Sequence, residues 1–117
     1  MDRKAIHEFA LKYYELFDNP NTKEYELDTT FGDECKAFGF EMDLGKRFAE
    51  TFKESSFDDL SVFERIGNTD EDIDLLGSGI VSHWRFITHW DCSDLTNPTN
   101  REWFKAALKR LAEITEE

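Results

Sequence analysis

The chain has 117 residues, a length that suits one domain with a core that needs no metal or disulfide. Its formal net charge is −12, so direct binding to DNA or RNA phosphates is not expected. No apolar run reaches the roughly 18 residues of a transmembrane helix, and the charged start MDRKAIHEF does not resemble a signal peptide. The absence of such a run predicts no membrane association. The two cysteines form no Cys-x-x-Cys motif, which predicts free thiols in a reducing cytoplasm.

The negative charge is concentrated in two runs. Residues 15–34 hold seven carboxylates and one lysine, and residues 58–74 hold seven carboxylates and one arginine, so each run carries −6. Such patches attract basic protein surfaces and speed association with them, although they also serve solubility alone. The candidate patch residues are Glu24, Glu26, Asp28, Asp58, Asp59, Asp70, Glu71 and Asp72.

The spacing of apolar residues predicts an all-α fold, a compact single-domain bundle of about five helices over residues 1–117. The first helix is expected over residues 2–17, with Ile6, Phe9, Ala10, Tyr13 and Phe17 on its buried face. The turn-forming residues that follow it end this helix. Residues 18–29 are then expected to form a loop, with a short extended piece at 25–27.

A long second helix is expected over residues 30–54. Gly39 and Gly45 weaken that helix by up to about 1 kcal/mol each, but the apolar stripe keeps its phase across both. A short third helix is predicted over residues 57–66, with acidic residues in its first turn.

The fourth helix, near residues 70–90, is predicted to be central, with helices two and five packed on it through aromatic contacts. Thr69 is its expected N-cap, and Gly77 and Gly79 would allow another helix to approach closely. A fifth helix is predicted to begin at Thr99, the first residue of a T-x-x-E capping box, and to fray after Glu113.

The richest polar cluster lies on the fourth predicted helix. Ser82, Arg85 and His89 are spaced i, i+3 and i+7, so they share one helix face, and Trp90 lies beside them. Arginine and histidine can clamp an anion or a partner carboxylate, and Trp and Arg are enriched at binding hot spots. The structural alternative is an Arg85 that is partly buried and paired with one of the many carboxylates.

The sequence predicts no metal site, no cofactor and no catalytic residue. His89 and Cys92 form His-x-x-Cys, which is at most half of a zinc site. No glycine-rich elbow or phosphate-binding loop accompanies the nucleophiles.

One resemblance covers residues 30–111. The pattern L-G-S-x-I-x-S-x-W-R-x-x-T-H-W over residues 76–90, followed by N-R-x-W-F over residues 100–104, resembles a group of small uncharacterised bacterial proteins. The segments F-G-D-E-C at 31–35 and G-F-E-M-D at 39–43 belong to the same pattern. The resemblance implies a bacterial or mobile-element setting and carries over no site residue.

Three functional hypotheses follow from these observations. The leading one is an interaction protein without catalytic activity, and its specific version is a phage or mobile-element inhibitor that binds a basic, nucleic-acid-binding site of a host protein. The alternative is a small enzyme or ligand-sensing domain that uses the face of Ser82, Arg85 and His89. A third is an obligate homo-oligomer that buries second apolar faces of helices two and four.

Overall fold

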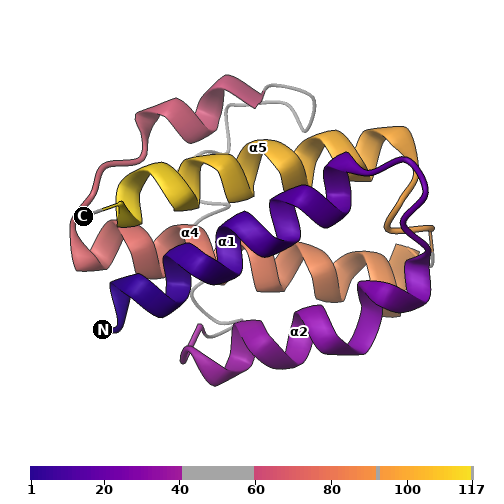
Figure 1. Cartoon of the computed structure of the whole chain (residues 1–117), viewed down its shortest axis with the longest axis horizontal. Helices are drawn as coiled ribbons and strands as arrows, with labels where there is room; N and C mark the ends of the chain where they lie inside the picture. Colours follow the sequence, from indigo (N-terminus) through magenta and orange to yellow (C-terminus); the bar gives the residue numbers. More distant parts are fainter. Residues whose placement is uncertain (41–59, 92, 117) are drawn as a thin grey trace.

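Helices form every regular element of residues 1–40, 60–91 and 93–116, the part of the chain that the computed structural model describes (Figure 1). The predicted all-α bundle is confirmed, and no helix in this part combines the length and apolar character needed to cross a membrane. The α-helices are α1 (Arg3–Asp18), α2 (Asp28–Ala37), α4 (Asp70–Arg85) and α5 (Pro98–Thr115). Two 3₁₀-helices, η1 (Glu24–Glu26) and η2 (Leu60–Arg65), and a π-helix, η3 (Phe86–Asp91), complete the order.

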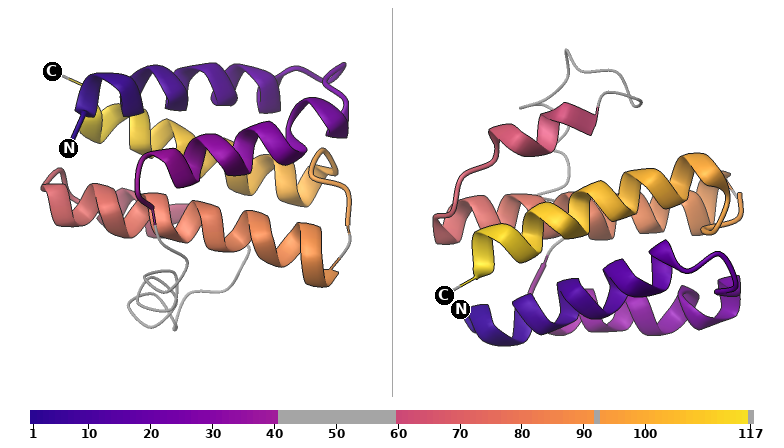
Figure 2. Two further views of the ribbon diagram at one scale, coloured as in Figure 1. Left: turned by 90° about the horizontal axis from the view of Figure 1, so that it is seen from below. Right: turned by 45° about the horizontal axis from the view of Figure 1, so that its top comes forward.

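The helices form a bundle in which α1 and α5 pair along most of their length (Figure 2). Helix α4 contacts both α2 and α5, as the sequence predicted, but α5 also contacts α1 and η2. The last helix therefore shares the central position with α4. The apolar periodicity of α5 could not indicate this central position, because periodicity does not identify which elements cover a helix.

An aromatic cluster holds the first, second and fifth helices together. The Phe31 ring lies 4.9 Å from Tyr13 and 5.6 Å from Phe104, and Phe17 stacks on Phe104 at 4.9 Å. Each of these four side chains is at most 1% exposed. Burial of rings of this size provides much of the apolar free energy available to a small domain.

The predicted uninterrupted helix over residues 30–54 is wrong. Helix α2 begins two residues earlier, at Asp28, and ends at Ala37. Gly39 follows with a φ of +83°, the left-handed conformation that terminates many helices, and its N–H donates to the Lys36 carbonyl at 2.9 Å. The helical spacing of apolar residues continues past Gly39 in the sequence, but this spacing alone does not determine whether the backbone stays helical. The rest of that prediction, residues 41–54, lies outside the described residues.

Glycines do permit close approaches between the second and fourth helices. A Cβ on Gly32 would lie 2.3 Å from Cη2 of Trp84, and a Cβ on Gly77 would lie 2.4 Å from Cε1 of Phe40. At Gly77 the predicted approach of another helix is wrong, because the Phe40 ring, which follows α2, makes the close contact there. The approach of α2 itself depends on Gly32.

Several predicted boundaries need correction. Residues 24–26 form a 3₁₀-helix instead of an extended piece, and residues 60–65 form a second one within the predicted helix 57–66. The fourth helix is α-helical from Asp70 to Arg85 and then continues as a π-helix to Asp91.

The predicted N-cap is correct for α4 and wrong for α5. Thr69 caps α4 as predicted, accepting from the Asp72 N–H at 3.1 Å while Asp72 accepts from the Thr69 N–H. Helix α5, however, is capped by Asn97, whose Oδ1 accepts from the Asn100 N–H at 2.8 Å, so the expected cap at Thr99 is wrong. Pro98 then occupies the first helical position, which suits its fixed φ and missing N–H. The expected fraying after residue 113 is also wrong, because the helix continues to Thr115, which is buried.

Candidate functional site

The predicted strip on the fourth helix spans a change in helix type. Ser82 is half-buried in α4, Arg85 is exposed at its last residue, and His89 is exposed in η3. The side chain of Trp90 lies outside the described residues. A π-turn has more residues than an α-turn, so His89 is rotated from the position that regular α-helical spacing gives it.

Side-chain hydrogen bonding accompanies this π-helix. The Thr88 hydroxyl donates to the Trp84 carbonyl at 3.0 Å, a back-bond that bends helices. The indole of Trp84 is 6% exposed and lies 6.2 Å, edge-on, from the His89 ring. The Lys36 ammonium lies 5.4 Å from the centre of the Trp84 ring, within the range of a cation–π contact. His89, at the end of the strip, therefore belongs to a surface that α2 and the end of the fourth helix build together.

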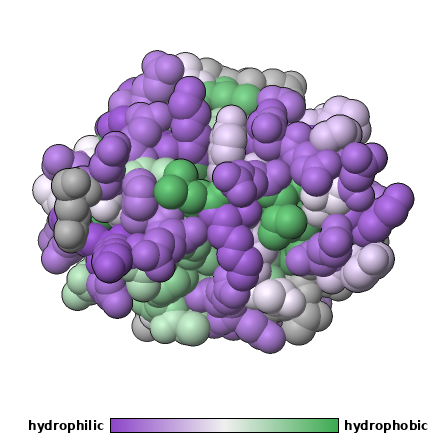
Figure 3. Space-filling model, in the orientation of Figure 1, coloured by the Kyte–Doolittle hydropathy of each residue, from purple (hydrophilic) through white to green (hydrophobic). Residues whose placement is uncertain are grey.

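A groove of about 440 Å³ runs between α1 and α5. Its apolar surface comes from Leu11, Tyr14 and Ala112, and Leu11 is 47% exposed. The polar part of the lining is His7, Lys109, Glu113 and Glu116. Hydrophilic residues surround apolar ones on the face that Figure 3 shows, which is the face that α1 and α5 present in Figure 1.

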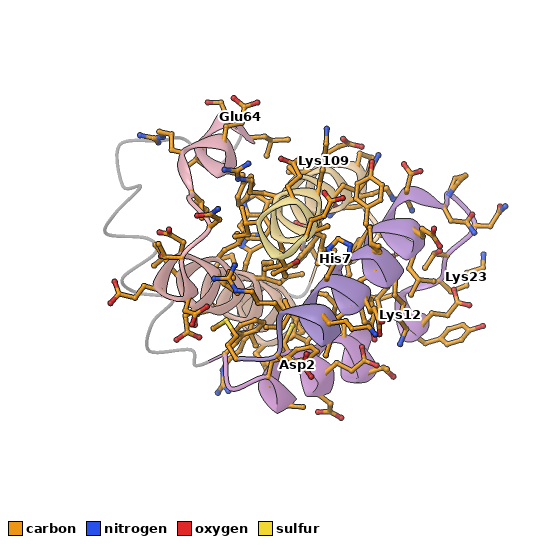
Figure 4. The ribbon with its side chains drawn as sticks, turned by 60° about the vertical axis from the view of Figure 1, so that its left-hand side comes forward. Asp2, His7, Lys12, Lys23, Glu64 and Lys109 are labelled. Atoms are coloured by element: carbon orange, nitrogen blue, oxygen red, sulfur yellow. The ribbon has the colours of Figure 1, made fainter. Side chains whose placement is uncertain are left out.

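His7 fixes one wall of the groove to the other. Its Nδ1 donates to the Ala112 carbonyl at 2.8 Å and lies 3.3 Å from the Thr115 hydroxyl, which itself donates to the Leu111 carbonyl. Figure 4 shows His7 pointing from α1 towards α5. Because Nδ1 carries the proton in this bond, Nε2 is the ring nitrogen left to accept from a ligand.

A second, smaller cleft of about 330 Å³ lies between η2 and α5. Lys109 and Glu113 line both cavities, so they form the ridge between them. Arg110 closes the inner end of the cleft, since its guanidinium donates to the Ile66 carbonyl and to Glu113 at 3.1 Å.

Acidic side chains gather beside the groove, where α1 and α4 begin and α5 ends. Figures 1 and 2 place these three chain positions at the same end of the bundle. The Arg3–Asp70 ion pair, at 2.8 Å, ties α1 to α4 there, and the Arg110–Ile66 bond ties α5 to the residues before α4. We call this surface the acidic end, and we define it by Asp70, Glu71 and Asp74 in the first turns of α4 and by Glu113 and Glu116 at the end of α5.

Parts of the two acidic runs lie at opposite ends of the bundle. The later run contributes Asp70 and Glu71 to the acidic end, whereas Glu24 and Glu26 lie in η1, near the C-terminal end of α1 (Figure 1). The two runs therefore do not form a single patch.

Several patch residues also have local structural roles. Asp72 belongs to the capping box of α4, Asp70 pairs with Arg3, and Glu26 accepts from the Lys23 N–H at 2.7 Å. The Glu24 carboxylate lies 3.5 Å from the Leu95 N–H. Asp28 begins α2, but its side chain, like the whole of Asp58 and Asp59, lies outside the described residues.

Two titratable groups are buried away from these surfaces. Cys35 is fully buried, and desolvation first, with the charge of Glu34 second, raises the pKa of its thiol. Burial also raises the pKa of the Tyr13 phenol, and neighbouring Glu34 and Cys35 add to the effect. Glu34 is the polar neighbour of the Tyr13 hydroxyl, but no hydrogen bond of normal geometry joins that hydroxyl to a partner in the described part of the chain. A neutral, enclosed thiol is a poor nucleophile, so this region is structural.

The chain matches no protein-family model, no curated protein and no solved structure. Among the residues that the structure describes, no three His, Cys, Asp or Glu side chains are grouped as a metal ion requires. The groove was missed in the sequence, although one signal was present. Leu11 is an apolar residue outside the buried stripe of its helix, but the signal is weak because single apolar residues are common on protein surfaces.

Proposed function

We propose that this protein is an interaction protein without catalytic activity, and that its acidic surface binds a basic surface of another protein. The observation that carries this proposal is the convergence of carboxylates from α4 and α5 at the acidic end, beside a groove with an apolar floor. Charged groups around an apolar centre are typical of protein interfaces.

The charge balance of the acidic end favours a basic partner. Arg3 pairs with Asp70, Arg110 pairs with Glu113, and Lys109 lies beside Glu113 in the groove lining. Glu71 and Glu116 are exposed and have no ion pair in the described part of the chain, so the acidic end keeps a net negative charge. Uncompensated surface charge of this kind steers an oppositely charged protein and slows association with nucleic acid or anionic lipid.

A narrower version of the proposal is an inhibitor, encoded by a phage or mobile element, that acts in a bacterial cytoplasm. Its carboxylates would occupy a site where the host protein binds nucleic-acid phosphates. Because η1, with Glu24 and Glu26, lies at the opposite end of the bundle from the start of α4, such a mimic would present one end and not both. Each surface has two ion-paired carboxylates, and the acidic end is the better candidate because its Glu113 and Glu116 also line the groove.

The proposal is tested by affinity capture from a bacterial lysate with two matched variants. Glu71→Gln/Glu116→Gln removes two charges from the acidic end, and Glu24→Gln/Asp33→Asn removes two from the earlier run. We expect the parent protein and the second variant to capture the same basic, nucleic-acid-binding protein at about 50 mM salt, with most of it lost at about 200 mM. The first variant should capture much less.

Two results would contradict the proposal. One is the capture of no basic protein by the parent chain at low salt. The other is equal capture by all three proteins, which would show that the location of the charge is irrelevant.

A second candidate function is a ligand-sensing domain or small enzyme that uses Ser82, Arg85 and His89. One observation favours it, namely that the π-helix η3 begins directly after Arg85, because π-turns are frequent at functional sites. Thermal unfolding in the presence of small phosphate and carboxylate anions tests it. A rise in the unfolding midpoint that Arg85→Gln/His89→Gln abolishes would support this function, and no rise with any anion would oppose it.

A further inference from the structure

The groove between α1 and α5 has the character of a peptide-docking surface. Leu11, Tyr14 and Ala112 provide its apolar floor, and its volume is about 440 Å³. Cavities of this size accommodate groups as large as a drug-sized ligand. Leu11 is 47% exposed, so a partner that covers it removes apolar surface from water, which favours binding.

Carboxylates lie on both sides of this floor. Glu8 and Glu15 are exposed three residues before and four residues after Leu11, so they share its face of α1. Glu113 and Glu116 lie on the opposite wall, together with Lys109. Lys12 is directed elsewhere, because its ammonium pairs with Glu34 on α2 at 2.9 Å. An apolar centre with acidic flanks is the complement of an apolar side chain with basic neighbours.

The groove exists before any partner arrives. The hydrogen bond from His7 to Ala112 holds the two walls at a fixed distance, and α1 and α5 pack along most of their length. A preformed surface loses little conformational entropy on binding, which increases affinity for a given contact area.

We infer that the groove binds an amphipathic basic segment of the partner protein, with one large apolar side chain on Leu11 and Tyr14. Flanking Lys or Arg side chains of that segment lie near Glu8, Glu15 and Glu116. The inference rests on the proposed function and adds the place and the chemistry of the contact. A second copy of this chain is the less suitable occupant, because two proteins of charge −12 repel each other.

Fluorescence anisotropy with two synthetic peptides tests the inference. One peptide is a Lys/Leu amphipathic helix of about four turns, and the other has the same lysines with serine at each leucine position. The parent protein should bind the Lys/Leu peptide about tenfold more tightly, the effect of burying roughly one large apolar side chain. Leu11→Ser should abolish this preference, and Leu11→Met should retain it.

Matched controls separate the groove from general charge attraction. Tyr25→Ser removes another exposed apolar side chain, 78% accessible and in η1, and should leave the tenfold preference unchanged. Glu8→Gln/Glu15→Gln should weaken both peptides severalfold, and more than Glu24→Gln/Asp33→Asn does. Unfolding midpoints of the variants should equal that of the parent chain, because each altered side chain is exposed.

The outcomes distinguish this inference from the proposed function. Equal affinity for the two peptides, or a preference that survives Leu11→Ser, would overturn the groove assignment and leave the acidic-surface proposal standing. Failure of both peptides to bind at low salt, together with failed lysate capture, would overturn both.

Discussion

The indole of Trp84 lies directly on the backbone of Gly32, so close that a Cβ there would be 2.3 Å from Cη2. Real Cβ atoms do not approach a ring this closely, so the contact requires glycine. It sets the distance between α2 and α4, and Lys36, one turn after Gly32, then places its ammonium over the same indole. The position of Gly32 therefore supports the surface that also contains His89.

Gly32→Ala should destabilise the protein by about 1–3 kcal/mol, the usual cost of adding a methyl group to a filled contact. The gain in intrinsic helix propensity, about 1 kcal/mol, offsets part of this. Urea unfolding followed by circular dichroism measures the change. Thr30→Ala, at an exposed site of the same helix, is the control. A Gly32→Ala protein as stable as the control would disprove the close contact.

Gly39→Ala should cost about 1–2 kcal/mol for a different reason. No atom of the described residues lies within 4 Å of the added Cβ, so the cost comes from the φ of +83°, which alanine adopts poorly. Gly39→Asn should cost less, because asparagine tolerates this conformation. Equal losses for the two variants in urea unfolding would mean that the backbone conformation is not the cause.

Two substitutions at the start of α5 test which residue caps this helix. Asn97→Ala should lower the free energy of unfolding by about 1 kcal/mol, because the Asn100 N–H loses its acceptor. Thr99→Ala should change it by less than about 0.5 kcal/mol, since Thr99 is exposed within the first turn. The reverse order of the two effects, measured by thermal or urea unfolding, would restore Thr99 as the cap.

Tyr13→Phe should leave the protein equally stable or more stable near pH 7. The hydroxyl that it removes is buried with Glu34 as its polar neighbour, but no hydrogen bond of normal geometry joins the two, so its loss removes a desolvation cost. Loss of stability or of folded structure in Tyr13→Phe would instead point to a hydrogen bond of that hydroxyl.

The same variant should change the dependence of stability on pH. An unfolded tyrosine loses its proton near pH 10, whereas the raised pKa of Tyr13 keeps the folded phenol protonated. The folded state then binds more protons than the unfolded state, so stability falls as pH rises above about 10, by at most about 1.4 kcal/mol per pH unit. The raised pKa of Cys35 adds a similar decline that begins near pH 8.5.

Urea unfolding at several pH values between 7 and about 11 measures both declines. Tyr13→Phe should flatten the decline above pH 10, and Cys35→Ala should flatten the part that begins lower. Parallel curves for the parent protein and both variants would show that neither group has a raised pKa in the folded state.

Local signals in the sequence predicted what depends on a few neighbouring residues. The stripe from Ile6 to Phe17 predicted the buried face of α1, because a helical repeat places these residues on one side whatever covers them. Thr69 was recognised as a cap because its partner Asp72 is three residues away. The same reasoning failed at Gly39, where an uninterrupted stripe outweighed the glycine, and at Thr99, where Asn97 is an equally local capping residue.

The sequence by itself determined an acidic, all-helical chain and the residues that its helices bury. The tertiary structure alone decided which surfaces those helices create together. The groove needs Leu11 beside Ala112, and the acidic end needs the start of α4 at the same end of the bundle as the end of α5, segments that are far apart in sequence. Burial is favourable against any apolar neighbour, so periodicity selects the face that is covered but not the helix that covers it.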